Sequence, residues 1–334
     1  MVKGRQSVLF DKPVYIEETA SVVGQKEGEG PLKDYFDIIE NDPVFGGKDW
    51  EEAESKLIEK TIDKLLIKAK RSIDDIRYIY AGDLLGQLIA SSFGLKKYDV
   101  PVFGLYGACS TFGEGLGLGA MSVSSGYADR VIVSASSHFA SAEKQFRFPL
   151  EYGNQRPPAS TWTVTGCGAV ILSSDMGQIK VSGMTTGKIV DYGVKDSMNM
   201  GACMAPAAAD LIMANFRDLE VDEKYYDLII TGDLGTVGRQ ILLDLLRENG
   251  YEISNRYKDC GIEMFDSESQ DTNAGGSGCG CSAVTLCSYL YKNLKSKKWK
   301  RILFVPTGAL LSTVSYNEGR SVPGIAHGVI LESV

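Results

Sequence analysis

The chain has 334 residues, of which 44% are apolar and 23% charged, as expected for a soluble globular protein large enough for two domains or halves. Its formal charge of −8 argues against nucleic-acid partners, because proteins that bind phosphate backbones carry a basic footprint. No apolar run approaches the ~20 residues that span a bilayer, and charges interrupt the first residues too early for a secretory signal. We therefore expect cytoplasmic synthesis.

The seven cysteines are an odd number without the paired spacing of a zinc site. We expect them to be free thiols, because disulfide frameworks are rare in a reducing compartment. The sequence also has neither an EF-hand loop nor a cluster of carboxylates that would hold calcium. It therefore predicts no metal site and no cofactor of its own.

The first half of the chain is predicted to be organised around one sharp turn. The stretch 101–138 predicts a strand, a small-residue turn at Cys109, a buried Gly/Ala-rich helix to Ser125 and a second strand. At such a corner a cysteine is exposed, and the helix N-terminus favours its thiolate. The alternative is a cysteine that only packs, since free cysteines are often buried.

The remaining helix and strands of this half are predicted from the spacing of apolar residues and from a helix-capping signal. A helix is expected to begin after Asp49, which can cap it, with Glu52 at the capping-box position. The strands expected here are 14–23, 76–81, 102–106 and 130–135.

A long loop or small subdomain is expected at about 138–160, because this segment is polar, aromatic and ends in prolines. It contains His138, Arg147 and Arg156, and His327 lies on a later loop. The histidines are candidate ligand contacts, although a lone histidine more often packs. For the arginines the alternative is solvated loop charge.

The rest of the chain, from residue 162 onward, predicts the same kinds of element. Its expected elements are strands within 162–173, 179–184, 226–232, 301–306 and 328–332, helices at 205–216, 239–248 and 283–294, and a glycine-rich turn at 271–282.

An internal repeat relates the two halves, taken as 1–175 and 176–334. The motif Ala-Gly-Asp-Leu at 81–84 recurs as Thr-Gly-Asp-Leu at 231–234, each after an apolar run. The turn at Cys109 then corresponds to Ser277–Gly280. Packing two such halves back to back would bring both turns to one cleft.

Three segments resemble the thiolase superfamily, and within it the type III ketoacyl-ACP synthases. They are GACSTFGEGLGLGAMSVSSGYADRVIVSAS around Cys109, the strand pair WTVTGCGAVIL and the turn GGSGCGCSAV. The resemblance covers nearly the whole chain. It implies two α/β halves, each with a five-stranded mixed sheet, stacked with central buried helices between them. It also implies a homodimer formed through the strand next to the cysteine corner.

The resemblance implies an incomplete catalytic set. A synthase of this kind needs a thiolate, an imidazole, and an amide or second imidazole that polarise the thioester. The nucleophile maps onto Cys109, but its partner positions map onto Gly232, followed by Asp233, and onto Ser277. The second cysteine of biosynthetic thiolases maps near Val322. Losing one oxyanion donor costs about 10²–10³ in rate, so a vestigial Cys109 in a binding protein is implied.

Two segments, FRFPLEYGNQRPPASTWTVTGCGA and SGCGCSAV, resemble a sporulation branch of the superfamily in spore-forming Firmicutes. This implies binding of dipicolinic acid (pyridine-2,6-dicarboxylate) as its calcium chelate, during uptake into the developing spore. The partners implied are membrane proteins of the same sporulation operon, at the periphery of the spore inner membrane. Calcium would be bound only through the ligand.

The cleft suits a carboxylate ligand, since glycine-turn amides, a helix N-terminus and arginines bind carboxylates. Asp233 would instead face a chelated metal. The residues expected around the ligand are Cys109, His138, Arg147, Arg156, Gly232, Asp233, Ser277, Gly278 and His327.

Two other functions stay open. One is an acyltransferase or hydrolase that uses Cys109 with altered partners. The other is a scaffold whose cleft has closed, for which the basic run 292–301 (KNLKSKKWKR) would contact anionic lipid or an acidic partner. A solvated helix end is the simpler explanation of that run.

Overall fold

The computed structural model describes residues 1–146, 155–175 and 177–334. The helices are α1 (Gln25–Gly28), α2 (Trp50–Ala69), α3 (Ile89–Leu95), α4 (Thr111–Ser125), α5 (Phe139–Phe146), α6 (Met200–Leu219), α7 (Gly235–Glu248), α8 (Cys260–Met264), α9 (Cys279–Thr285), α10 (Tyr291–Lys295) and α11 (Thr313–Asn317). A π-helical turn, Leu286–Leu290, joins α9 to α10. No helix in the described ranges combines the length and apolarity needed to cross a membrane.

The strands form one large mixed sheet and two short two-stranded sheets. They are β1 (Val2–Lys3), β2 (Ser7–Leu9), β3 (Tyr15–Gly24), β4 (Ile38–Glu40), β5 (Tyr78–Asp83), β6 (Val102–Gly104), β7 (Arg130–Ser137), β8 (Trp162–Thr163), β9 (Gly166–Ser173), β10 (Ile179–Thr185), β11 (Leu228–Thr231), β12 (Tyr257–Asp259), β13 (Gly276–Ser277), β14 (Arg301–Val305), β15 (Thr307–Ala309), β16 (Gly324–Ala326) and β17 (Gly328–Ser333).

The large sheet is built from two five-stranded units with the same internal order. Its path is β12-β11-β14-β17-β10-β3-β9-β7-β5-β6. In one unit β5 pairs in parallel with β6 and β7, while β9 is antiparallel to β7 and β3. In the other, β11 pairs in parallel with β12 and β14, while β17 is antiparallel to β14 and β10. The predicted fold of two similar halves is therefore confirmed.

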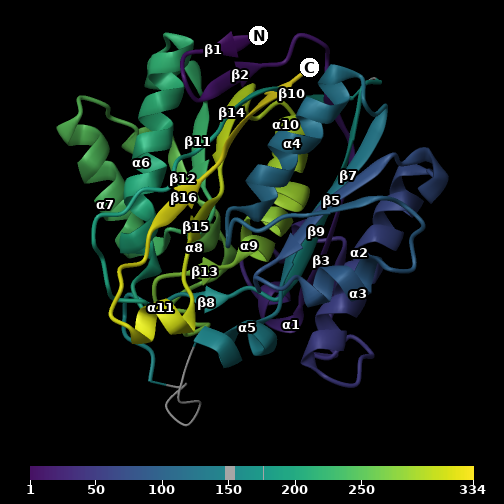
Figure 1. The fold of residues 1–334 in the computed structure, drawn as a ribbon, viewed down its shortest axis with the longest axis horizontal. Coiled ribbons are helices and arrows are strands. Elements are labelled where there is room, and N and C mark those ends of the chain that lie inside the picture. The colour runs from purple at the N-terminus through teal and green to yellow at the C-terminus, as the bar shows by residue number, and fades with distance from the viewer. Residues whose placement is uncertain (147–154, 176) are drawn as a thin grey trace.

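The two units meet along a short seam. Strands β3 and β10 pair only through Ile16 with Ile179 and Tyr15 with Lys180. Figure 1 shows α2 and α3 on one flank, α6 and α7 on the other, and α4, α9 and α10 between them. The helices between the flanks are the central buried helices predicted from the Gly/Ala-rich segments.

A close approach explains one of the glycines in these central segments. A Cβ atom on Gly168 of β9 would lie 2.4 Å from the carbonyl carbon of Ala283 in α9. Glycine at this position therefore lets the central helix lie directly against the sheet. The N-terminal end of α9 lies close to the end of β7, where the N–H of Gly280 donates to Ser137 Oγ at 3.2 Å.

Helix α2 begins where its capping signals predicted, whereas α6 and α7 begin five and four residues before their predicted starts at 205 and 239. Asp49 Oδ1 accepts the backbone N–H of Glu52 at 2.9 Å, and Glu52 Oε2 accepts that of Lys48 at 2.8 Å. These two bonds close the expected capping box of α2. The helix then buries Leu57 and Leu65 against the outer face of its sheet.

The segment predicted as a loop or small subdomain is partly helical. Its first residues form α5, which contacts α2 and β8. A helix was not predicted here because the segment lacks a capping box and a long apolar period. Residues 147–154 of this segment lie outside the described ranges.

Candidate functional site

The corner between β6 and α4 places Cys109 at the start of the central helix. Ala108 has the left-handed φ of 49°, an unusual conformation for a residue with a Cβ. Hydroxyls hold the turn, since Ser110 Oγ donates to the Gly107 carbonyl and Thr111 Oγ1 donates to the Ala108 carbonyl, both at 2.7 Å. The predicted strand, turn and helix are confirmed here.

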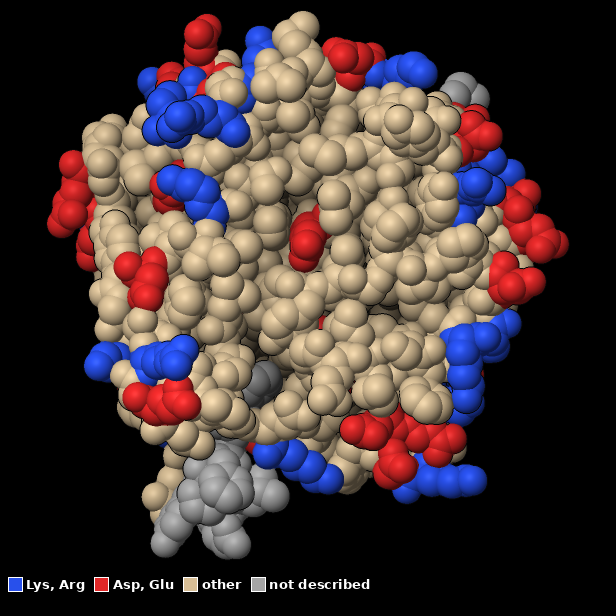
Figure 2. All heavy atoms as spheres, in the orientation of Figure 1, with Lys and Arg blue, Asp and Glu red and all other residues tan. Residues whose placement is uncertain are grey.

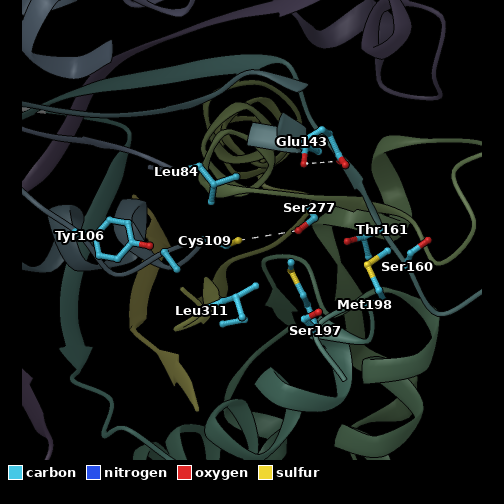
Figure 3. A pocket seen from close by; sticks show the side chains of 14 residues that line it. Leu84, Tyr106, Cys109, Glu143, Ser160, Thr161, Ser197, Met198, Ser277 and Leu311 are labelled. Atoms are coloured by element: carbon cyan, nitrogen blue, oxygen red, sulfur yellow. Dashed lines mark hydrogen bonds between the residues drawn. The ribbon is translucent and has the colours of Figure 1, made fainter. Parts of the chain in front are cut away.

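A pocket with about 620 Å³ of empty space, its open mouth included, lies over this corner. Both halves contribute to it, as the repeat predicted (Figure 3). Its described lining residues are Leu84, Tyr106, Ala108, Cys109, Glu143, Ser160, Thr161, Thr163, Ser197, Met198, Met200, Ser277, Ala309 and Leu311.

At the inner end of the pocket, Cys109 faces a buried carboxyl group through a serine. Cys109 Sγ lies 4.0 Å from Ser277 Oγ, and Ser277 Oγ donates to Asp233 Oδ2 at 2.9 Å (Figure 3 draws the first contact). Thr307 Oγ1 donates to Asp233 Oδ1 at 2.8 Å. Asp233 is fully buried and does not line the pocket, so the structure does not place it where a chelated metal would lie.

This environment disfavours a thiolate. Burial, and after it the neighbouring Asp233 charge, raise the pKa of the Cys109 thiol well above its usual value. Burial likewise raises the pKa of Asp233, although the hydrogen bonds it accepts oppose that shift. The expectation that a cysteine at this corner is exposed is wrong, because Cys109 is 4% exposed, and this burial opposes the thiolate that a helix N-terminus favours.

The glycine-turn amides are engaged within the protein. The N–H of Gly278 donates to Asp233 Oδ2 at 3.0 Å, and the N–H of Gly280 donates to Ser137 Oγ at 3.2 Å. The idea that these amides bind a ligand carboxylate is therefore wrong, because both are already paired. Only Ser277 of this turn lines the pocket.

The structure does not bring His138 to the pocket. Its ring packs against Phe45 and Trp50, and Nε2 lies 2.9 Å from the carbonyl oxygen of Pro43. Burial lowers the pKa of His138 below its usual value. This places the imidazole on the α2 side of β7, away from Cys109.

His327 is also outside the pocket. It is buried between β16 and β17, and burial lowers its pKa to about 4. Its Nδ1 has no hydrogen-bond partner among the described residues. Since the chain has only two histidines and both are described, no imidazole lines the pocket.

Arg156 forms an ion pair with Asp271 instead of lining the pocket. Its Nη2 donates to Asp271 Oδ2 at 2.6 Å, and its guanidinium lies 4.8 Å from the ring centre of Trp162. It does not line the pocket, so the bidentate clamp is not formed by this side chain as placed. Arg147 lies outside the described residues.

Gly232 lies in the core next to β15. A Cβ atom there would lie 3.0 Å from both Pro306 Cα and Thr307 N, closer than side chains normally pack. Val322, the other position mapped from the resemblance, is buried among core residues of the second half. Neither residue lines the pocket, so neither contacts a ligand there.

Several lining residues were not predicted from the sequence. Tyr106 lies at the end of the strand segment, Glu143 is on the unpredicted α5, and Met198 and Met200 precede the predicted helix of the second half. Their only sequence signal is closeness to the predicted turns. No group of three or more His, Cys, Asp or Glu side chains is arranged to hold a metal within the described ranges.

The fold, and the two facing turns at Cys109 and Ser277, indicate a structural class of protein. A single-residue variant of OleA from Xanthomonas campestris aligns over 97% of this chain and 99% of its own, with a TM-score of 0.61 and 14% identity. The 3-oxoacyl-[acyl-carrier-protein] synthase III of Aquifex aeolicus VF5 aligns over 98% and 99%, with a TM-score of 0.52 and 13% identity. The tetronic acid condensing enzyme AbyA1 aligns over 96% and 100%, with a TM-score of 0.59 and 13% identity. The chain therefore has the thiolase fold of condensing enzymes.

The sequence narrows this class to one family. The profile of stage V sporulation protein AD (SpoVAD) matches residues 4–332. Stage V sporulation protein AD of Bacillus subtilis (strain 168) is 41% identical over 329 residues, which is 98% of this chain and 97% of that protein. The chain belongs to the stage V sporulation protein AD family. This confirms the resemblance to a sporulation branch of the superfamily.

Proposed function

We propose that this chain is a non-catalytic binding protein for dipicolinic acid, taken up as its calcium chelate into the developing spore. It would pass the ligand to membrane proteins of the same sporulation operon. The observation that carries this proposal is the buried Cys109 thiol in an open pocket that neither of the two histidines lines. Membership of a sporulation family supports the biological setting.

The chemistry of the inner pocket supports binding over condensation. A condensing enzyme needs a thiolate and donors that stabilise an oxyanion. Here Ser277 directs its hydroxyl proton to Asp233, and burial next to that acid disfavours the thiolate. The apolar and hydroxyl-bearing lining is suited to a small planar ligand.

The direct test is calorimetric titration of the purified protein with calcium dipicolinate. We expect saturable binding at one site per chain, with calcium chloride alone and calcium picolinate, which has one carboxylate, as controls. A folded protein that gives no saturable heat with calcium dipicolinate would contradict the proposal.

A second candidate is acyl transfer or hydrolysis by Cys109. The left-handed Ala108 favours it, because strained corners are common at nucleophiles. Incubation with acyl-CoA donors followed by mass spectrometry decides between the two functions. We expect no acyl adduct on Cys109, and a stoichiometric adduct that forms within minutes would favour the enzyme.

The same proposal places the chain at the surface of the spore inner membrane, and the basic run 292–301 is the contact that we propose. Lys295, Lys297 and Lys298 are exposed and form no ion pair with any described residue. Lys298 also lies 5.1 Å from the ring centre of Trp299, a residue type common at membrane interfaces.

Replacing Lys297 and Lys298 by Gln is expected to weaken binding to anionic vesicles roughly 30-fold, because each lysine near such a surface contributes about 1 kcal/mol and the two together about 2 kcal/mol. Flotation with phosphatidylglycerol vesicles measures this effect, and Lys56→Gln on α2 is the matched control. Unchanged flotation of the double variant would leave a solvated helix end as the explanation.

A homodimer formed through β6 is a further part of the proposal. This strand ends the sheet, and Val102 and Phe103 are 46% and 47% exposed. Figure 2 shows that charged side chains lie mainly around the edge of the face that carries α4, while its middle is largely uncharged. An apolar edge strand beside an uncharged surface is suited to pairing with a second copy.

Replacing Phe103 by Glu is expected to raise the dimer dissociation constant at least about tenfold, because a buried charge would replace an apolar contact. Light scattering after size exclusion at micromolar concentration measures the mass, and Phe93→Glu on α3, which is 51% exposed, is the control. A wild-type protein that is monomeric under these conditions would contradict the dimer.

A further inference from the structure

The hydroxyl of Ser277 in the pocket wall has its hydrogen-bond direction set from behind by Asp233. Ser277 is 5% exposed and lines the pocket, and its Oγ donates to Asp233 Oδ2 at 2.9 Å. A hydroxyl has one proton and two lone pairs, so a group that takes the proton leaves the oxygen to act as an acceptor. Toward the pocket, Ser277 therefore presents lone pairs and no proton.

The contacts of Asp233 keep both of its carboxyl oxygens in the role of acceptors. The backbone N–H of Gly278, which can only donate, is directed at Oδ2 at 3.0 Å. Thr307 Oγ1 accepts the backbone N–H of Asp233 at 3.4 Å and donates its own proton to Oδ1 at 2.8 Å. Because Asp233 is fully buried, these bonds form away from bulk water. The fold thus fixes the direction of the Ser277 hydroxyl.

Several apolar side chains lie as deep in the pocket as Ser277. The lining residues Leu84, Ala108, Cys109 and Ala309 are only 3–6% exposed. Figure 3 shows the Cys109 sulfur directed at Ser277, with Leu84 on the same side of the pocket as Cys109. The deep part of the pocket therefore offers a ligand apolar surface and the Ser277 acceptor.

Such a surface suits the C–H edge of an aromatic ring better than a carboxylate. A carboxylate against Ser277 would face lone pairs, and behind them the buried Asp233, without a hydrogen bond from either. The edge of an aromatic ring carries partial positive charge, and its C–H groups make weak hydrogen bonds to oxygen. In calcium dipicolinate the nitrogen and both carboxylates hold the metal on one side of the ring. The C–H edge lies on the opposite side.

We propose that Ser277 selects the orientation of the planar ligand, and that Asp233 is the positioning residue that keeps the Ser277 hydroxyl an acceptor. The ring edge opposite the metal lies against Ser277, and the metal and the carboxylates lie toward the mouth of the pocket. This assignment rests on the proposed function and adds the orientation of the ligand and the residues that set it.

The test compares two ligands of nearly the same shape. Pyrazine-2,6-dicarboxylate has a nitrogen lone pair where dipicolinate has the ring C–H opposite the metal. Calorimetry in saturating calcium gives the ratio of the affinities for the two chelates. We expect the wild-type protein to prefer calcium dipicolinate at least about fivefold, because the pyrazine nitrogen would face the lone pairs of Ser277 without a donor.

Variants of the two residues change this ratio in different ways. Ser277→Ala removes the opposing lone pairs, and we expect the preference to fall at least about threefold. Asp233→Ala frees the hydroxyl proton to donate to the pyrazine nitrogen, so we expect the preference to reverse. Asp233→Asn should keep the wild-type ratio, because its amide oxygen can accept from both Gly278 and Ser277. Ser197→Ala, which removes another buried lining hydroxyl, is the matched control and should also keep it.

The outcomes separate this assignment from the proposed function. If neither chelate binds the folded wild-type protein, the proposed function fails, and this assignment fails with it. If the pyrazine chelate binds wild type at least as tightly as calcium dipicolinate, or if Ser277→Ala keeps the wild-type ratio, the assignment fails and dipicolinate binding stands. Thermal unfolding checks that each variant is folded, and Ser277→Ala decides if Asp233→Ala does not fold.

Discussion

Replacement of Cys109 by phenylalanine is expected to lower the affinity for calcium dipicolinate at least about 100-fold, as measured by calorimetry. Cys109 lies at the inner end of the pocket, 4.0 Å from Ser277. A phenyl ring from this position would occupy the space that a planar ligand needs. The effect therefore tests where the ligand lies without depending on any chemistry of the sulfur.

The alanine variant of Cys109 distinguishes the effect of filling the pocket from the effect of losing the sulfur atom. Cys109→Ala keeps the pocket open, and we expect its affinity to stay within a few-fold of wild type. Equal losses in both variants would instead make the thiol itself a ligand contact. Because Cys109 is 4% exposed and a ring there stresses the core, Ala309→Phe from β15 provides a second way to fill the pocket. Normal binding by both filled variants would place the ligand elsewhere.

The second large effect concerns stability and its dependence on pH. Glu27 of α1 is 1% exposed, and its Oε1 accepts the N–H of Thr165 at 3.0 Å. Burial raises its pKa from 4.5 to about 7. Between these values the unfolded chain releases a proton that the folded chain keeps, so stability falls as the pH rises. Above pH 7 the buried Glu27 carboxylate lowers the free energy of unfolding by its full amount, about 3 kcal/mol.

Glu27→Gln is expected to raise the free energy of unfolding at pH 8 by about 3 kcal/mol, because the amide keeps the acceptor for Thr165 and cannot ionise. Urea unfolding at pH 4.5, 6 and 8 measures the effect, which should be small at the lowest pH. Burial also raises the pKa of Glu54 to about 7, so the variant should keep part of the slope. Glu29→Gln, an exposed neighbour, should change little. An unchanged slope in Glu27→Gln would contradict the assignment.

The fold was largely predictable because its signals are local and repeated. The apolar runs that became β7 and β14, the capping box of α2 and the repeated Gly-Asp motif each fix an element or a relation between halves. The elements that were missed lack such signals. Helix α5 has no capping box, and α8 spans only five residues, which is too short to show a helical period.

The site was predictable only in part. The repeat brought Cys109 and Ser277 together correctly, because equivalent turns of two similar halves meet at their interface. The prediction placed His138 near the cleft, but its side chain lies on the opposite side of β7. Because side chains alternate between the two faces of a strand, this orientation could have been predicted. Ser137 binds Gly280 on the central side, so Ser136 and His138 face α2, where Ser136 Oγ donates to Glu54.

The pairing state of the polar groups could not be predicted from the residues alone. The amide of Gly278 looked available for a ligand, and only its position opposite Asp233 shows that it is engaged. Similarly, the carboxylate next to the pocket is that of Glu143, while Asp233 is held behind Ser277. Such outcomes depend on contacts between residues far apart in the sequence, which periodicity and motif spacing do not encode.

The crowding at Gly232 limits how this scaffold can be re-engineered. An imidazole introduced there would push its first carbon against the backbone of Pro306 and Thr307. Thr307 also supports Asp233, so that backbone cannot shift without loosening the buried acid. A designer who wants a condensing enzyme from this chain must therefore first rebuild the 305–308 segment, and a single substitution will not suffice.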